Sequence, residues 1–176
     1  MARPSFPADA LRALAVSEPG APRLALIDAR LSGLDETELR ESARALAERS
    51  GAAHEARSYR HPYAVVAWHP EPLGVDIERI EPCEPGFAEA ICTQRERAAA
   101  AALAGDKRDS FLISLWSSKE ALSKALGDAL DYDPRRLEGP LGWPQGRSGR
   151  WRAEQLELPS GYVGWVCWRA EKAAAS

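Results

Sequence analysis

The segment RDSFLISLWSSKEALSKALG, residues 108–127, is the longest amphipathic stretch of the chain and constrains its fold most strongly. Apolar side chains recur along one face at helical spacing, which predicts a helix that packs this face against the rest of the protein. Gly127 is the expected end of the helix, because glycine readily adopts the left-handed conformation found after a last helical turn. The apolar face consists mainly of Phe111, Leu112, Leu115, Leu122 and Leu126.

The other periodic segments predict further helices and several strands. Residues 34–51 are expected to form a helix, because apolar residues recur at helical spacing and acidic residues crowd its first turn. The remaining expected elements are a short helix at 8–15, a strand at 23–31, two strands within 62–78, a helix at 86–105, and a β-hairpin made of 150–158 and 161–169.

The order of these elements predicts an α+β fold made of two small pseudo-symmetric lobes, each with a helix packed on antiparallel strands. We expect the first lobe to span residues 1–80 and the second to span residues 81–176. A functional site is then expected between the lobes, where residues from both meet.

Composition is that of an ordinary soluble globular protein, with 176 residues of which 45% are hydrophobic and 28% are charged. The formal net charge of −3 gives no sign of a polyanion-binding surface over the whole chain. No apolar run approaches the roughly 20 residues of a membrane span, and MARPSFPADA lacks the apolar core of a signal peptide. The 3 cysteines lack C-x-x-C spacing, so we expect no disulfide framework, no zinc site and a cytoplasmic location.

The stretch LGVDIERI, residues 73–80, interrupts an apolar strand with two acids. Side chains alternate between the faces of a strand, so Asp76 and Glu78 share one face and the aliphatic residues share the other. A solvated acidic face is the commonest explanation of an isolated D-x-E pair. The alternative is a site for a hard cation, because Mg²⁺ binds one or two protein carboxylates and leaves room for phosphate oxygens and water.

A second charged pattern lies on the long helix, in WSSKEALSK at residues 116–124. Trp116, Glu120 and Lys124 are spaced four residues apart and therefore lie along one helical face. Taken alone, Glu120 and Lys124 have the spacing of a surface ion pair that contributes about 0.3–0.5 kcal/mol.

Together, the D-x-E strand and the W-S-x-K-E-A-x-x-K helix that follows it resemble the 4′-phosphopantetheinyl transferase superfamily. The resemblance covers roughly residues 57–170 and is closest to the two-lobed type that activates synthetases of surfactin-like peptides. Glu96 stands where this family places an acid between the two motifs.

The resemblance implies an enzyme that transfers the 4′-phosphopantetheine arm of coenzyme A to a serine of an acyl or peptidyl carrier protein and releases 3′,5′-ADP. It implies Mg²⁺ as the cofactor and a role in fatty acid, polyketide or nonribosomal peptide biosynthesis. The expected partners are coenzyme A and the carrier protein, with no nucleic acid and no membrane. The expected oligomeric state is a monomer or a weak dimer.

The resemblance also assigns roles to the charged residues of the two motifs. Asp76, Glu78 and Glu120 would hold the Mg²⁺ ion. Lys124 would direct its ammonium group at the pyrophosphate, and either Glu120 or Glu96 would accept the serine proton.

Three further residues would bind coenzyme A in this scheme. By its family position, His61 would lie near the 3′-phosphate. Lys119, about 100° round the long helix, would either reach a phosphate or stay solvated. The family's usual S-H-S sequence is Arg60-His61-Pro62 here, so both flanking hydroxyls are absent and Arg60 is expected to replace them electrostatically.

Two alternatives stay open at the level of sequence. The first lobe has one clear helix before His61, at residues 34–51, and looks shortened. A family member that binds coenzyme A or a carrier protein without catalysis, as a partner or regulator, is therefore an alternative to the enzyme. A second, weaker alternative is that the Arg- and Trp-containing stretch at residues 135–152 forms a surface that binds single-stranded nucleic acid.

Overall fold

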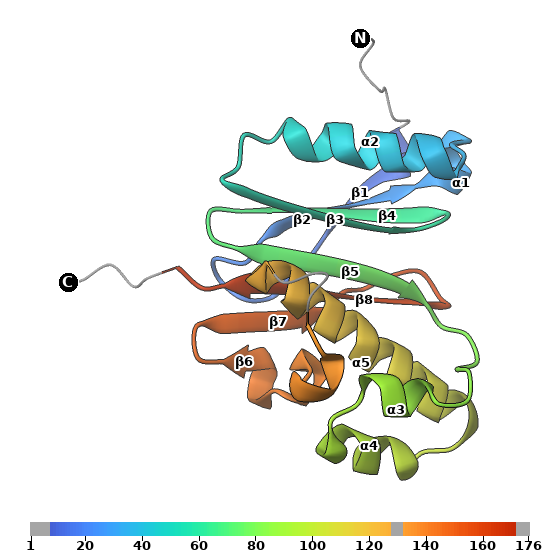
Figure 1. Cartoon of the computed structure of the whole chain (residues 1–176). Coiled ribbons are helices and arrows are strands. Elements are labelled where there is room, and N and C mark those ends of the chain that lie inside the picture. Colours follow the sequence, from blue (N-terminus) through green and yellow to red (C-terminus); the bar gives the residue numbers. More distant parts are fainter. Residues whose placement is uncertain (1–7, 128–131, 172–176) are drawn as a thin grey trace, which may run out of the picture.

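The structure is a computed structural model that describes residues 8–127 and 132–171. Within these residues, the strands form two four-stranded antiparallel sheets (Figure 1). The first sheet has the order β1-β2-β4-β3 and contains β1 (Leu11–Leu14), β2 (Arg23–Asp28), β3 (His54–Arg60) and β4 (Tyr63–His69). The second has the order β5-β8-β7-β6 and contains β5 (Leu73–Arg79), β6 (Arg147–Ser148), β7 (Trp151–Gln155) and β8 (Tyr162–Arg169).

Each sheet is covered by one of the two longest helices (Figure 1). Helix α2 (Glu36–Glu48) packs on the first sheet, and helix α5 (Gly105–Leu126) packs on β5 and β8 of the second. The shorter elements are α1 (Ala29–Ser32), α3 (Phe87–Ile91), α4 (Gln94–Ala101) and the 3-10 turns η1 (Ala8–Ala10), η2 (Pro134–Arg136), η3 (Pro140–Gly142) and η4 (Pro144–Gly146). The expected α+β class, with a helix on antiparallel strands in each half, is confirmed.

The two sheets pack against each other through a shared apolar core. Val65 of the first sheet and Val75 and Val166 of the second are completely buried in this layer. Leu73 and Ile77 belong to the same core, as the alternation of residues 73–80 predicted. The other face of β5 is therefore the one that carries Asp76 toward helix α5.

Strand β5 and helix α5 approach each other unusually closely at Gly74. A Cβ atom built on Gly74 would lie 2.6 Å from Ala125 N and 2.8 Å from Lys124 Cβ, and it would also clash with Ala121 O. Real Cβ atoms essentially never come within 3.0 Å of another heavy atom, so only glycine allows this contact. The absence of a side chain at Gly74 brings the acidic strand next to the helix that carries Lys124.

Two of the predicted elements differ clearly from the structure. The single helix expected at residues 86–105 is two helices, because Cys92 is extended and the Thr93 side chain accepts a hydrogen bond from Glu96 N to begin α4. The short helix expected at 8–15 is the turn η1 followed by β1, which pairs with β2 along its whole length. Sheet pairing outweighs the helix propensity of this alanine-containing segment.

The predicted division into lobes at residues 1–80 and 81–176 stays a prediction. Strand β5 hydrogen-bonds to β8 in the second sheet, and its apolar face packs against the first sheet. The D-x-E strand thus lies where the two sheets meet.

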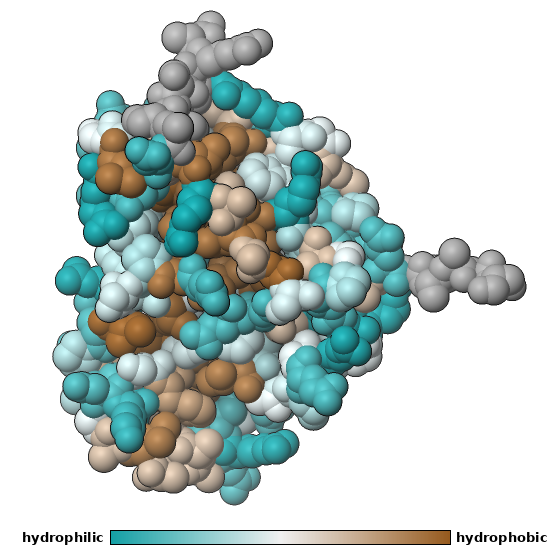
Figure 2. Space-filling view, turned by 180° about the vertical axis from the view of Figure 1, so that it is seen from behind, coloured by the Kyte–Doolittle hydropathy of each residue, from teal (hydrophilic) through white to brown (hydrophobic). Residues whose placement is uncertain are grey.

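The surface carries few large apolar side chains. On the face opposite to that of Figure 1, hydrophobic residues gather mainly in the upper and central part, between hydrophilic ones, and smaller groups lie in the lower part (Figure 2). Among the described residues, the exposed large hydrophobic side chains are Leu31, Tyr59 and Leu126. None of the described helices is both long enough and apolar enough to cross a membrane.

We predict that Gly74→Ala destabilises the protein by about 1–3 kcal/mol or more, since backbone of α5 has to move to admit the methyl group. The measurement is the free energy of unfolding in urea. Gly142→Ala is the matched control, because a Cβ atom on Gly142 would meet no heavy atom within 4 Å and the residue has no positive φ. Equal stability of the two variants would contradict the close approach of β5 and α5.

Candidate active site

Asp76 is the most buried acid of the D-x-E strand, with 4% of its surface exposed. Its Oδ1 accepts a hydrogen bond from Ser58 Oγ at 3.0 Å and forms an ion pair with Lys124 Nζ at 2.7 Å. Its Oδ2 is buried and has no hydrogen-bond partner among the described residues. An unsatisfied carboxylate oxygen in a buried position is costly, so this atom is suited to a ligand that the protein alone does not supply.

Lys124 reaches Asp76 from helix α5, across the close contact at Gly74. Its ammonium group also donates to Val75 O at 3.3 Å, while 28% of the side chain stays exposed. The group is therefore held against the acidic strand but is still accessible to a solute.

Glu78 lies two residues farther along β5 and pairs with Arg60 of β3. Arg60 Nε donates to Glu78 Oε2 at 2.7 Å, and Arg60 Nη2 contacts the same oxygen. Burial and the neighbouring charge of Asp76 raise the pKa of the Glu78 carboxyl, and the Arg60 guanidinium opposes this rise.

Strands β3 and β5 meet along a polar seam, which we define by the pairs Ser58–Asp76 and Arg60–Glu78. Ser58 Oγ also accepts a hydrogen bond from Ile77 N at 3.3 Å. The seam joins the edge strands of the two sheets through side chains, since the two strands are not paired in either sheet.

Glu120 stands on α5, one turn before Lys124. The Tyr132 hydroxyl donates a hydrogen bond to Glu120 Oε1 at 2.7 Å. Burial raises the pKa of the Glu120 carboxyl, the Tyr132 hydrogen bond lowers it, and the charge of Asp76 adds to the rise. The influence of Asp76 on both Glu78 and Glu120 means that Asp76 is electrostatically coupled to each of the other two carboxylates.

The three carboxylates match a hard cation in their chemistry, although each is turned to a protein partner. Within residues 8–127 and 132–171, no three His, Cys, Asp or Glu side chains converge as a ready metal site. The buried, unpartnered Oδ2 of Asp76 is the observation that favours a cation, because oxygen donors of this kind are those that Mg²⁺ prefers. Burial is the main cause of the raised pKa values of Glu78 and Glu120, and the charge of Asp76 contributes to both.

Glu96 and Lys119 form a separate, buried ion pair. Lys119 is 0% exposed, and its Nζ donates to Glu96 Oε2 at 2.6 Å, to Ile91 O at 2.7 Å and to Pro134 O at 2.7 Å. Glu96 Oε2 also accepts from Thr93 N at 2.8 Å. Every ammonium hydrogen of Lys119 has an acceptor, so this pair has the geometry of a structural anchor.

His61 lies at the turn between β3 and β4, next to the Arg60–Glu78 pair. Its Nε2 is 3.4 Å from Leu34 O, and its carbonyl oxygen accepts a hydrogen bond from the Tyr162 hydroxyl at 3.3 Å. The imidazole is exposed at this end of the sheets and is free to contact a solute.

A cleft of about 470 Å³ opens beside Lys124, between β3 and the end of α5. Its lining residues are Glu55, Ala56, Arg57, Tyr59, Leu73, Lys124 and Gly127. Arg57 and Lys124 bring positive charge to the cleft, where Arg57 contacts Glu55 at 3.5 Å and Lys124 contacts Asp76 at 2.7 Å. Tyr59 offers an aromatic face that is partly covered by Arg40.

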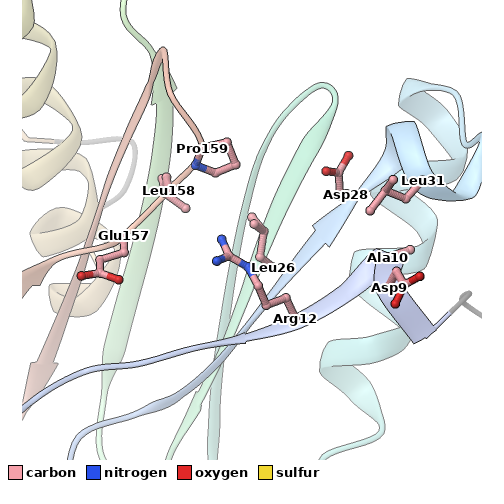
Figure 3. A pocket seen from close by; sticks show the side chains of 9 residues that line it. All are labelled: Asp9, Ala10, Arg12, Leu26, Asp28, Leu31, Glu157, Leu158 and Pro159. Carbon is pink, nitrogen blue, oxygen red and sulfur yellow. The ribbon is translucent and has the colours of Figure 1, made fainter.

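A second groove, of about 480 Å³, lies between β1, β2 and the connection that precedes β8 (Figure 3). It contains none of the predicted site residues and carries more acids than bases. Its lining residues are Asp9, Ala10, Arg12, Leu26, Asp28, Leu31, Glu157, Leu158 and Pro159.

The structure therefore brings part of the predicted set together. Asp76 and Lys124 are in contact, Glu78 and Glu120 are coupled to Asp76, and Glu96 and Lys119 lie in a different cluster. The roles of all these residues stay predictions.

Two residues that contact the carboxylates, Ser58 and Tyr132, were not predicted from the sequence. The signal for Ser58 was its position two residues before Arg60, since side chains two residues apart share a face of an extended segment. Tyr132 carries no comparable signal, because its contact with Glu120 depends on the path of the chain after α5.

Comparison with known proteins places the chain in a family. A sequence profile described as the 4′-phosphopantetheinyl transferase superfamily matches residues 72–162. A 4′-phosphopantetheinyl transferase of Bacillus subtilis is 31% identical over 78 residues, which are 44% of this chain and 35% of that protein. A holo-[acyl-carrier-protein] synthase of Streptococcus uberis is 35% identical over 63 residues, which are 32% of this chain and 53% of that protein. The matches thus span about a third to a half of these relatives.

We predict that Glu120→Gln raises the melting temperature of the metal-free protein at pH 7. The pKa of Glu120 is raised in the folded state, so its ionised form costs stability above the ordinary value of 4.5. Each kcal/mol of relief corresponds to about 2–4 °C in a chain of this size. The advantage of the variant should vanish as the pH falls below 4.5, where the parent carboxyl is neutral as well. Melting curves in EDTA from pH 4 to pH 8 test this, and a variant less stable than the parent at every pH would refute it.

We also predict that Lys119→Met lowers the free energy of unfolding by about 3–5 kcal/mol, because it leaves Glu96 charged and buried without its partner. The double variant Lys119→Met/Glu96→Gln should recover part of this loss. Urea unfolding of the three proteins gives the comparison. If Lys119 instead contacts coenzyme A, the single variant should keep its stability and show a higher Michaelis constant for coenzyme A.

Proposed function

The chain belongs to the 4′-phosphopantetheinyl transferase superfamily, and from that premise we propose that it transfers the 4′-phosphopantetheine arm of coenzyme A to a serine of an acyl or peptidyl carrier protein. In this reaction the serine oxygen attacks the β-phosphorus, the bond from that phosphorus to the α-phosphate oxygen breaks, and 3′,5′-ADP leaves. Such a transfer needs chiefly positioning and charge neutralisation.

The contact between Asp76 and Lys124 is the observation that carries the proposal. It joins a carboxylate and an ammonium group from two elements inside the matched residues 72–162, beside a cleft of about 470 Å³. Phosphoryl transfer uses carboxylates to hold cations and ammonium groups to neutralise phosphate oxygens.

Lys124 neutralises negative charge on the pyrophosphate in this mechanism. Its ammonium group contacts Asp76 and Val75 O, but the side chain stays partly exposed. A phosphate can therefore replace these contacts without unfolding any element. Holding the group in place beforehand reduces the reorganisation that the transition state requires.

Asp76, Glu78 and Glu120 would hold Mg²⁺. When bound, the ion neutralises charge on the pyrophosphate and makes the β-phosphorus more electrophilic. Asp76 would contribute Oδ2, which has no partner among the described residues, while the Ser58 hydroxyl keeps Oδ1 oriented.

The serine proton needs a carboxylate acceptor. Glu120 is the better candidate of the two predicted, since it lies on the same helical face as Lys124, which contacts Asp76. Glu96 already accepts from Lys119, Thr93 and Gly139, which leaves it little capacity for a further proton.

Coenzyme A would bind along β3, with Arg57 and Lys124 in the cleft and Arg60 and His61 at the far end of the strand. Arg60 would act on the 3′-phosphate through its charge, while its guanidinium also stays paired with Glu78. Recognition of the 3′-phosphate is the role proposed for the exposed imidazole of His61.

A non-catalytic protein that binds coenzyme A or a carrier protein is the second candidate. The observation in its favour is the limited coverage, since the matches reach only 35% of the Bacillus subtilis relative and 53% of the Streptococcus uberis one.

Intact mass spectrometry distinguishes the two candidates. An apo carrier protein is incubated with this protein, coenzyme A and Mg²⁺, and the enzyme predicts a gain of one phosphopantetheine group on the carrier. A binder predicts an unchanged carrier mass together with a measurable complex. The same assay without the protein controls for spontaneous transfer.

We predict that Lys124→Ala lowers the turnover number by roughly 10²–10³-fold, the effect expected when one preorganised stabilising group is removed. Lys124→Arg should restore only part of the activity, because the guanidinium is planar and wider than an ammonium. Lys107→Ala, on the exposed first turn of the same helix, is the control and should keep full activity. A higher Michaelis constant with an unchanged turnover number would assign Lys124 to ground-state binding alone.

A further inference from the structure

Tyr132 lies on the segment that follows α5 in the chain, yet its hydroxyl reaches back to Glu120 on that helix. The separation of 2.7 Å between Tyr132 Oη and Glu120 Oε1 is that of a strong hydrogen bond to an ionised carboxylate. The tyrosine ring is half-buried, so water competes only weakly for this contact.

The backbone around Tyr132 is fixed to the same helix by a second contact. Pro134, two residues later, accepts a hydrogen bond through its carbonyl oxygen from Lys119 Nζ at 2.7 Å. Lys119 is completely buried and is itself held by Glu96. Lys119, the residue before Glu120 on α5, therefore anchors the segment that carries Tyr132.

This arrangement leaves Glu120 with one engaged oxygen and one available oxygen. Oε1 accepts from Tyr132, whereas Oε2 makes no hydrogen bond to the described part of the chain. Asp76 shows the same division, since its Oδ1 is bonded and its Oδ2 is unpartnered among the described residues. Each of the two carboxylates is thus held through one oxygen. This restricts the direction in which its second oxygen can point toward a ligand.

We propose that Tyr132 is a positioning residue whose hydroxyl fixes the Glu120 carboxylate so that it binds a divalent cation jointly with Asp76. This inference rests on the metal site of the proposed function. Carboxylate ligands of metal ions are in general oriented by such outer hydrogen bonds, and their loss costs about 10–100-fold in metal affinity or activity. Tyr132 acts through Glu120 and does not itself touch the ion or the substrates.

The test is the affinity of the full-length, metal-free protein for Mn²⁺, with free Mn²⁺ followed by electron paramagnetic resonance. Tyr132→Phe keeps the ring and removes only the hydroxyl, and we expect its dissociation constant to rise roughly 10–100-fold. Tyr63→Phe is the matched control, because it removes the same atom from a tyrosine that packs against Tyr162 and Arg30. The control should bind Mn²⁺ like the parent, and the melting temperatures of both variants check that they fold.

A double-mutant cycle separates positioning from packing. In a Glu120→Gln background, Tyr132→Phe should change the dissociation constant little, because the carboxylate that it orients is gone. An equal loss in both backgrounds would show that the hydroxyl acts independently of Glu120 and would overturn the proposal. Parent-like Mn²⁺ binding by Tyr132→Phe, or a parent that binds no Mn²⁺, would overturn it as well.

Failure of the proposed function gives a different result. If the parent binds Mn²⁺ and Tyr132→Phe binds it roughly 10–100-fold more weakly, but the parent modifies no carrier protein, the positioning role stands and the transferase assignment falls.

Discussion

The contact of β5 with α5 at Gly74 determines where the charged groups of the candidate site lie. Without a Cβ atom between them, the strand and the helix come close enough for Lys124 to reach Asp76 across 48 residues of sequence. The same helix places Lys119 in the protein interior, where its ammonium group donates to three acceptors. These two lysines of the helix thus differ in role. Lys119 makes all its hydrogen bonds within the fold, whereas Lys124 stays accessible to a solute.

Much of the fold could be predicted from local patterns, and the errors have identifiable causes. The amphipathic helix at 108–127 and the hairpin at 150–169 are present because their apolar periodicity is strong. Strand β3 escaped prediction, because as an edge strand it is mostly exposed or half-exposed and lacks a clear apolar alternation. The break before α4 was readable from Thr93 and Glu96, whose spacing is that of a capping box.

The candidate site could be predicted only where a motif marks it. Asp76 and Lys124 belong to motifs whose combination indicated their proximity, and the structure has them in contact. The burial of Lys119 was not predictable, because it depends on carbonyl groups from two other segments that local spacing does not reveal. The contact of Tyr132 with Glu120 was not predictable for the same reason, because it depends on the path of the folded chain.

The polar seam between β3 and β5 has a consequence for the solubility of the protein. An edge strand exposes unpaired amide and carbonyl groups that can recruit a strand from another molecule. On β5, the Ile77 amide is instead satisfied by the Ser58 hydroxyl, and Asp76 and Glu78 place charge along the same border. Asp76 and Glu78, which we propose as metal ligands, therefore also hold β3 against this sheet edge. A substitution chosen to remove metal binding also removes a side-chain contact that keeps the edge covered.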